Sequence, residues 1–313
     1  MLILGIDTSN YATSLAVYDT KAEEVVCDVK KFLPVAKGQL GLRQSDALFH
    51  HTTALPILLE HLSQKVDLTQ IQAVGVSEKP RPVEGSYMPC FLAGVSAAQA
   101  FCLSKNIPLI KTTHQQGHIA AALYATKQKH LLQQKTLVFH ISGGTTDLLL
   151  CENLQVLEML GTSTDLYAGQ AVDRLGVRLG FDFPAGVSVS AKAAECTEKV
   201  KGIKVSIKGT NCSLSGLENQ CERLLNDGKS QEYVCKFCLL AVAKTVLQMI
   251  EAAHQIYPNL PVVCAGGVMS SEVIRTEVQR KLPDVYFVDG KFSSDNAIGT
   301  AFIAGREVDS WQK

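Results

Sequence analysis

The chain opens with an apolar run, a polar turn and a second β-rich run, and the same plan returns near its middle. Residues 2–18 read LILGIDTSNYATSLAVY, and residues 137–151 read LVFHISGGTTDLLLC. Each segment is typical of a β-hairpin whose tip is built from Gly, Ser, Thr and Asp. Two such hairpins in one chain predict a duplicated fold in which a hairpin opens each half.

Strands alternate with helical patterns along the rest of the chain. We expect strands at 71–78, 107–113, 261–265 and 285–288, and helices at 45–65, 87–105, 168–180, 231–256, 270–281 and 295–306. This alternation predicts an α/β fold with parallel or mixed sheets covered by helices. The repeated hairpin divides the chain into a first domain, 1–108, completed by a C-terminal helix in 293–313, and a second domain, 109–292.

Composition and charge limit the classes of partner. Apolar residues make up 46% of the 313 residues and charged residues 19%, which excludes a disordered chain. Lys and Arg together number 30, as do Asp and Glu, so the net charge is zero. Because there is no global positive field, a nucleic-acid or membrane partner requires a local basic patch or a helper protein.

Several features predict a cytoplasmic protein without membrane contact. Asp7 interrupts the N-terminal apolar run before it reaches the length of a signal peptide. We expect the apolar stretch 237–250 to be too short and too polar to span a bilayer. The ten cysteines lie in apolar segments and are expected to be buried thiols. Cys235 and Cys238 form a CxxC inside a helical pattern, which favours two core thiols over a metal or redox site.

A histidine pair, His114 and His118, lies in the segment HQQGHIAAALYA. Residues i and i+4 share a face of a helix, so both imidazoles can reach one metal ion. No Glu follows the first histidine, which excludes the HExxH of zinc proteases. HxxxH is by itself more often two helix histidines without a ligand. A metal needs a third ligand, and Asp295, at the start of the last predicted helix, has suitable chemistry.

Three turns are of a kind that binds ligands. Adjacent glycines in SGGTTD (142–147) let backbone amides approach a phosphate, although a plain tight turn has the same sequence. The matching tip, 7–10, favours a functional role, because two facing polar tips make a cleft for a polyphosphate-like ligand. Gly266 and Gly267 follow a strand and precede a helix, where a ring or phosphate can lie against the backbone; a close βα turn is the alternative.

The segment GTSTDLYAGQAVDRLGVRLGFDFPAG (161–186) carries acids that suit a nucleoside. Asp165 and Asp173 have side chains able to bind ribose hydroxyls, and Gly186 ends a Pro-Ala-Gly turn. Solvent-facing helix acids are the alternative interpretation of both aspartates.

These turns, in this order, resemble the actin–sugar kinase–Hsp70 (ASKHA) fold, in which two duplicated α/β domains clamp a nucleotide in the cleft between the lobes. Seven ordered segments sharpen the resemblance: GIDTSNYATSLAVYD, HQQGHIAAALYA, ISGGTTDLL, the segment 161–186, NCSLSGLENQ, CAGGVMSSEVIR and SSDNAIGTAFIA. The chain thereby resembles, over essentially its whole length, the tRNA N6-adenosine threonylcarbamoyltransferase family (TsaD/Kae1). The seven segments in this order are far more specific for the family than any one segment alone.

The resemblance implies a set of site residues. The second domain carries the metal-binding histidines, and the metal is iron, zinc or magnesium, held by His114, His118 and Asp295. The adenylate phosphates lie on a loop of His140, Ile141, Ser142, Gly143, Gly144 and Thr145. The nucleoside contacts are Asp173, Gly186, Gly266, Gly267 and Ser271, with Asp7 and Asp165 as further candidates.

The resemblance also implies the reaction and the partners. In the family a metal holds threonylcarbamoyl-adenylate, the exocyclic amine of the adenosine beside the tRNA anticodon attacks the carbamoyl carbonyl, and AMP leaves. ATP or AMP are related ligands. Family members act with protein partners that help to bind tRNA, and a homodimer or heterodimer is left open.

The chain departs from the family pattern at several positions. Asn10, Tyr11 and Ala12 replace a Cys, Asp and Glu at the first tip, and Gln170 replaces a ribose-binding Glu. Thr145 replaces a His, Ser271 an Asn, and SEKPRPVEGSYMP (77–89) replaces a glycine-rich segment. These departures motivate two alternatives, namely a non-catalytic nucleotide- and metal-binding subunit and a carbamoyl transfer to a small molecule. Two basic runs are candidate tRNA contacts or solvated faces: Lys127, Lys129, His130 and Lys135, and Lys199, Lys201, Lys204 and Lys208.

Overall fold

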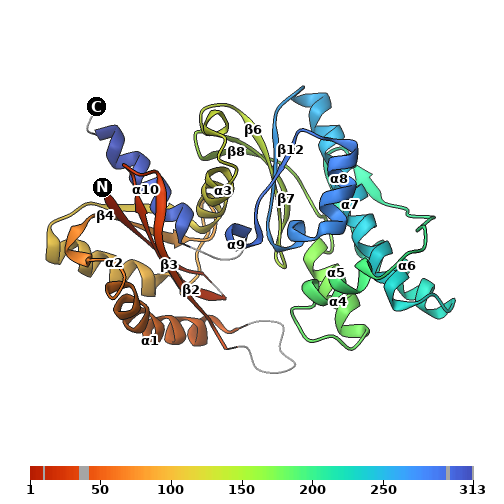
Figure 1. Ribbon diagram of the computed structural model, residues 1–313, viewed down its shortest axis with the longest axis horizontal. Helices are drawn as coiled ribbons and strands as arrows, with labels where there is room; N and C mark the ends of the chain where they lie inside the picture. The colour runs from red at the N-terminus through yellow and green to blue at the C-terminus, as the bar shows by residue number, and fades with distance from the viewer. Residues whose placement is uncertain (10, 35–41, 294–296, 312–313) are drawn as a thin grey trace. The chain divides into compact units, whose positions relative to one another are not determined.

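The computed structural model describes residues 1–9, 11–34, 42–293 and 297–311. The chain forms two compact units, one made of Met1–Lys127 with Ser294–Lys313 and the other of Gln128–Ser293 (Figure 1). Each unit contains a five-stranded mixed sheet. The duplicated hairpins predicted from the sequence are confirmed, because a two-stranded antiparallel hairpin opens each sheet.

The first unit holds the N-terminal hairpin in a sheet of order β3-β2-β1-β4-β5. Its strands are β1 (Leu2–Thr8), β2 (Ala12–Asp19), β3 (Glu24–Phe32), β4 (Ile71–Lys79) and β5 (Leu109–Thr113). Its helices are α1 (Gln44–Ser63), η1 (Leu68–Gln70), α2 (Phe91–Lys105), α3 (His114–Ala125) and α10 (Ile298–Trp311). The first three strands are antiparallel, while β4 runs parallel to β1 and β5 parallel to β4.

The two faces of this sheet follow from alternation along the strands. Leu4 and Ile6 of β1 belong to a core cluster that is completed by α1 and α2. Ile3, the residue before Leu4, points to the opposite face and belongs to a second cluster with Ala304 and Val308 of α10. The last helix of the chain therefore covers the face of the first sheet opposite α1 and α2 (Figure 1).

The second unit has the sheet order β12-β11-β6-β7-β8. Its strands are β6 (Thr136–Ile141), β7 (Thr146–Glu152), β8 (Gln155–Thr162), β11 (Val262–Ala265) and β12 (Val285–Phe287), with a separate hairpin of β9 (Ser206–Lys208) and β10 (Asn211–Ser213). Its helices are η2 (Lys129–Leu132), α4 (Ala168–Arg178), α5 (Gly186–Ala194), α6 (Ser215–Asn226), α7 (Gln231–Ile256), η3 (Gly267–Ser270), α8 (Glu272–Lys281) and α9 (Gly290–Ser293).

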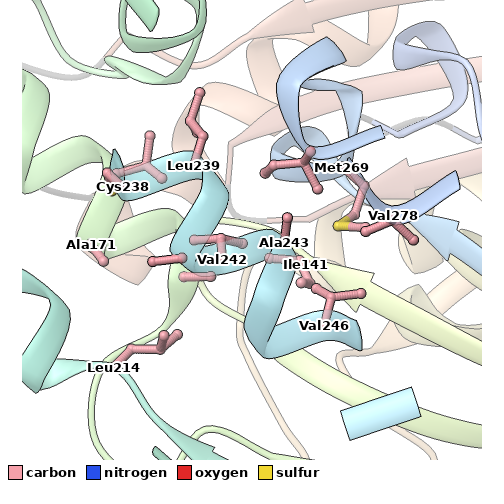
Figure 2. Packing of buried hydrophobic residues seen from close by; sticks show 14 of the residues in the cluster. Ile141, Ala171, Leu214, Cys238, Leu239, Val242, Ala243, Val246, Met269 and Val278 are labelled. Atoms are coloured by element: carbon pink, nitrogen blue, oxygen red, sulfur yellow. The ribbon is translucent and has the colours of Figure 1, made fainter. Parts of the chain in front are cut away.

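Helix α7 is the centre of the second core. Figure 2 shows Val242, Ala243 and Val246 of α7 among side chains from β6, α4, η3 and α8, including Ile141 and Met269. By length and composition α7 is apolar enough to cross a membrane, which corrects the expectation that this stretch is too short and too polar. In the structure 78% of its most apolar window is buried inside the protein, as in the core helix of a soluble protein.

The boundary between the units differs from the expected one. Strand β5 pairs with β4 in the first sheet, and α3 packs against α10, so the first unit extends to Lys127 rather than to residue 108. His114 and His118 consequently belong to the first unit and not to the second. The C-terminal helix α10 belongs to the first unit.

All ten cysteines are buried and unpaired, as the sequence predicts. Cys235 and Cys238 lie inside α7, and burial raises the pKa of the Cys235 thiol to about 12. A hydrogen bond with Cys221 and burial raise the pKa of the Cys238 thiol as well, so both thiols are protonated core side chains at neutral pH.

Candidate metal and nucleotide sites

The histidine pair lies where β5 passes directly into α3. Thr113 caps the helix, because its hydroxyl accepts from the Gln116 amide at 3.2 Å while the Gln116 side chain accepts from the Thr113 amide at 3.2 Å. This capping box makes His114 the first residue of the helix. His118 then follows one turn later on the same face.

The two imidazoles converge. Nε2 of His114 and Nε2 of His118 are 3.0 Å apart, and their ring centroids are 4.3 Å apart. Behind them, Nδ1 of His114 lies 3.1 Å from Oδ1 of Asp7. Asp7, near the end of β1, is 1% exposed. A carboxylate that accepts from Nδ1–H selects the tautomer in which Nε2 carries a lone pair.

This geometry fits a pair of metal ligands. Metal–nitrogen bonds of about 2.1 Å place two ligand nitrogens about 3.0 Å apart at a right angle and about 3.4 Å apart at the tetrahedral angle of zinc, so the observed separation is at the short end of this range. A metal-binding histidine normally donates its other N–H to a carboxylate, which is the position of Asp7. Among the described residues, no group of three or more His, Cys, Asp or Glu side chains is arranged to hold a metal. The predicted third ligand, Asp295, lies outside the described residues.

Small residues bring α10 against the histidine helix. A Cβ added to Gly299 would overlap the carbonyl oxygen of Gly117 and lie 2.7 Å from the amide nitrogen of Ala121. The Ala297 amide, just before α10, donates to the Ser14 hydroxyl at 2.9 Å. The backbones of α3 and α10 are therefore in direct contact one turn after His114.

The β6–β7 turn in the second unit is held by its own hydroxyl groups. The Ser142 amide donates to the Thr145 carbonyl at 3.0 Å, and the Ser142 and Thr145 hydroxyls are 2.8 Å apart. The Thr145 hydroxyl also lies 3.1 Å from Nδ1 of His140. A Cβ added to Gly143 or Gly144 would meet no atom within 4 Å, so one side of the turn is open.

Two further segments approach this turn. The Ala168 amide, at the N-terminus of α4, donates to the Thr146 hydroxyl at 2.9 Å, and a Cβ on Gly169 would overlap the carbonyl oxygen of Ser142. On the other side, Gly266 (φ 99°) lies against the backbone of Ile141. A helix N-terminus and a glycine-rich turn that meet in this way favour an anion.

The residues predicted to contact the nucleoside lie in two segments of the second unit, one around Asp173 and Gly186 and the other around η3. Oδ1 of Asp173 accepts from the Ala185 amide at 2.8 Å, next to Gly186, and burial raises the pKa of Asp173. Gly267 is the first residue of η3, after Gly266. Ser271 is 7% exposed, and its hydroxyl has no hydrogen-bond partner within the part of the chain that the structure describes.

The Asp165 carboxylate is held by hydrogen bonds from two segments of the second unit. Its carboxylate accepts from the Leu166 amide at 2.5 Å, the Leu214 amide at 2.8 Å and the Ser215 hydroxyl at 2.6 Å. Burial acts to raise its pKa, but these hydrogen bonds and one from Ser213 hold the pKa well below its usual range. Asp165 therefore ties the loop before α4 to the start of α6.

Two departures from the family pattern have structural consequences. The Gln170 side chain accepts from the Tyr167 amide at 3.3 Å, so it caps the helix whose N-terminus faces the 142–145 turn. At the first tip Ala12 is fully buried and Tyr11 is 44% exposed, whereas Asn10 lies outside the described residues.

Some contacts of the candidate sites have no counterpart in the sequence patterns. The Asp7–His114 contact joins residues 107 positions apart, and no local sequence pattern predicts it. The closeness of Gly117 and Gly299 has a signal, because a glycine inside each helical pattern indicates a close approach. Cys90 is also near Asp7, and burial together with that carboxylate raises the pKa of its thiol to about 12, so the thiol is protonated at neutral pH.

The fold and these sites define a two-unit ASKHA protein. Phosphate- and nucleotide-bound full-length HypF has the same fold, with a TM-score of 0.63 at 12% identity over 98% of this chain and 46% of that one. A glucokinase from Streptomyces griseus, in complex with glucose and AMPPNP, gives a TM-score of 0.54 at 12% identity, covering 98% of this chain and 100% of that one.

The particular family is shown by the sequence. The profile of the tRNA N6-adenosine threonylcarbamoyltransferases, TsaD, matches residues 37–302. A tRNA N6-adenosine threonylcarbamoyltransferase from Anoxybacillus flavithermus is 27% identical, over 95% of this chain and 89% of the relative. The chain belongs to the TsaD family.

Proposed function

We propose that the protein transfers a threonylcarbamoyl group from threonylcarbamoyl-adenylate to N6 of the adenosine beside the anticodon of tRNA, releasing AMP. Family membership supports this activity over a non-catalytic subunit and over transfer to a small molecule. The single observation that carries it is the convergence of the His114 and His118 Nε2 atoms, 3.0 Å apart, with the Asp7 carboxylate behind His114.

His114, His118 and Asp295 hold a divalent metal ion, and iron or zinc suits two imidazoles and a carboxylate best. When bound, the ion supplies Lewis-acid polarisation of the carbamoyl oxygen and neutralises negative charge. The chain's own contribution is to orient the ligands, since Asp7 holds His114 in the tautomer whose Nε2 lone pair can bind the ion. Burial of Asp7 keeps water from competing for that hydrogen bond.

The 140–145 turn holds the adenylate phosphates. Its glycines leave one side of the turn open, although the Gly144 amide donates to the Ser142 hydroxyl at 3.3 Å, and the N-terminus of α4 adds a positive dipole end at the same place. These groups stabilise the phosphate of AMP as it leaves. Asp173 and Gly186 contact the ribose, while Gly266, Gly267 and Ser271 line the adenine side; the unsatisfied Ser271 hydroxyl supports this assignment.

We place the protein in the cytoplasm, where tRNA is modified, and expect it to act with protein partners of the same pathway. Its zero net charge supports a requirement for partners, because tight tRNA binding depends on many Lys and Arg contacts to phosphate.

The test is a reconstituted transfer assay. The protein is mixed with unmodified tRNA, threonylcarbamoyl-adenylate, a divalent metal and candidate partner proteins, and digested tRNA is analysed for modified adenosine by mass spectrometry. We expect modification by the wild type and none by His114→Ala. Absence of modified adenosine with every partner and metal would refute the proposed function.

A further inference from the structure

An exposed segment, 199–208, follows α5 in the second unit and ends with strand β9. Its lysines are exposed, whereas Val200, Ile203, Val205 and Ile207 are partly buried against the core around α7. Gly202 has a positive φ of 77°, which only glycine adopts without strain. Lys201 and Gly202 are both exposed, which shifts the alternation by one residue, so the lysines on both sides of Gly202 remain exposed. We call Lys199, Lys201, Lys204 and Lys208 the lysine row.

Side chains from two helices fix the backbone of this segment. The Lys201 amide donates to the Tyr233 hydroxyl at 3.3 Å. The Gln220 side chain bonds both the amide (3.2 Å) and the carbonyl (3.0 Å) of Lys204. Lys244 of α7 donates to the carbonyl of Ile203 at 3.0 Å. The lysine row is therefore carried by an anchored backbone, which lowers the entropic cost of presenting its charges together.

The acids of this region are paired with other cations. Glu195 pairs with Lys192 and Glu198 with Lys229, on the approach to the row. On α6, Glu218 pairs with Arg174 and Glu222 with Arg178. Across the described residues, no carboxylate lies within ion-pair distance of any lysine of the row. Four uncompensated positive charges on a neutral protein form the kind of local patch that a polyanion needs.

We infer that the lysine row binds the phosphate backbone of RNA. In extended chain the lysines recur every two to four residues, about 7–13 Å apart, so one row reaches several phosphates. Ammonium groups contact phosphates as point charges and read no sequence, which suits a docking surface away from the modified base. The choice of RNA as the polyanion rests on the proposed function. The exposure of the lysine row and its lack of ion-pair partners within the described part of the chain are observed independently of that function.

The test compares two variants with equal loss of charge. In the first, the four lysines of the row become glutamine. In the control, four exposed lysines elsewhere become glutamine: Lys21, Lys31, Lys65 and Lys281. Binding of an unmodified tRNA transcript to the full-length protein, alone and together with the partner proteins of the transfer assay, is measured by fluorescence anisotropy between 25 and 200 mM salt. These concentrations span the range over which phosphate contacts lose affinity steeply, roughly 50–200 mM.

We expect the row variant to lose tenfold or more in tRNA affinity at low salt. Its log–log salt slope should fall by about three, since each phosphate contact contributes about 0.7–0.9. The control variant should bind like the wild type. Lysine acetylation read by mass spectrometry should show that tRNA protects the row and leaves the control lysines reactive.

Each result decides the inference. An unchanged slope in the row variant, equal losses in both variants, or no tRNA binding by the wild type either alone or with the partner proteins overturns it. If the row variant loses binding but the wild type modifies no tRNA, the RNA surface stands and the proposed function fails. If the wild type modifies tRNA and the row variant binds normally, the inference alone fails.

Discussion

Oδ1 of Asp7 lies 3.1 Å from Nδ1 of His114, although 107 positions separate the two residues. The contact joins the end of β1 to the start of α3, and the carboxylate is almost fully buried. The contact sets the direction in which the His114 ring binds: an Nδ1–H engaged by a carboxylate leaves the Nε2 lone pair facing His118, where the proposed metal ion would bind.

Replacing the buried carboxylate, Asp7→Asn, should weaken metal binding by about 10- to 100-fold. This is about the usual loss of metal affinity when a metal-binding histidine loses the carboxylate that accepts its other N–H. The amide keeps an acceptor oxygen but removes the negative charge that raises the basicity of His114. Metal affinity can be measured by competition with a chelator. Asp227→Asn, on an exposed residue after α6, is the control. Equal metal affinity for wild type and Asp7→Asn would show that Asp7 does not orient the site.

Removing one imidazole, His118→Ala, should abolish both stoichiometric metal binding and transfer activity, because the remaining histidine cannot form the pair. His61→Ala, on the exposed end of α1, should leave both unchanged. Metal content after gel filtration and the transfer assay provide the two readouts. Full metal occupancy in His118→Ala would contradict the proposed ligand set.

The contact between α3 and α10 should not tolerate an added methyl group. Gly299→Ala places a Cβ onto the carbonyl of Gly117, and backbone cannot move as a side chain can. We expect the free energy of unfolding to fall by about 1–3 kcal/mol. Gly216→Ala, in α6, meets no atom within 4 Å and should raise it by up to about 1 kcal/mol. Urea denaturation of both variants measures the difference, and equal stability would refute the close packing.

The two adjacent glycines after β11 should behave differently. Gly266→Ala must keep a φ of 99° against the Ile141 backbone and should lower the free energy of unfolding by about 2 kcal/mol. Gly267→Ala has open space and should change it by less than about 1 kcal/mol. Thermal unfolding gives the stabilities, and calorimetry with AMP shows whether Gly267→Ala still loses affinity, as a ligand contact there requires. Similar stabilities would contradict the assigned backbone role of Gly266.

Asp165 should make stability depend on pH in the acid range. Its folded pKa lies below the unfolded value of about 3.9, so its stabilisation is fully present above that value and is lost as the pH falls toward the folded pKa. The stability difference between wild type and Asp165→Asn should therefore shrink from pH 6 to pH 3. Urea denaturation across this range measures it. A difference independent of pH would show that the carboxylate charge does not matter.

Much of the fold is predictable because the spacing of apolar residues along the sequence indicates helices and strands. The helix predicted over 231–256 has the observed bounds, and both hairpins follow from a polar turn between two apolar runs. Helices α5 and α6 are not among the predicted elements. The 3.6-residue spacing also puts His114 and His118 on one helix face from the sequence alone.

Long-range pairing decides the rest. Strand β5 belongs to the first sheet because it pairs with β4, and this moves the histidine helix out of the unit where the repeat places it. Asp7 is a candidate ligand contact from its place in the first tip, but only the folded chain brings it to His114.

The sequence by itself determined the order and type of most elements, the histidine pair and the glycine turns, since these depend on residues close together in the chain. The tertiary structure alone decided that the Asp7 carboxylate faces the His114 imidazole, that α3 belongs to the first unit, and that the lysine row has no ion-pair partner among the described residues. Those outcomes depend on contacts between residues far apart in the chain, whose partners no local pattern specifies.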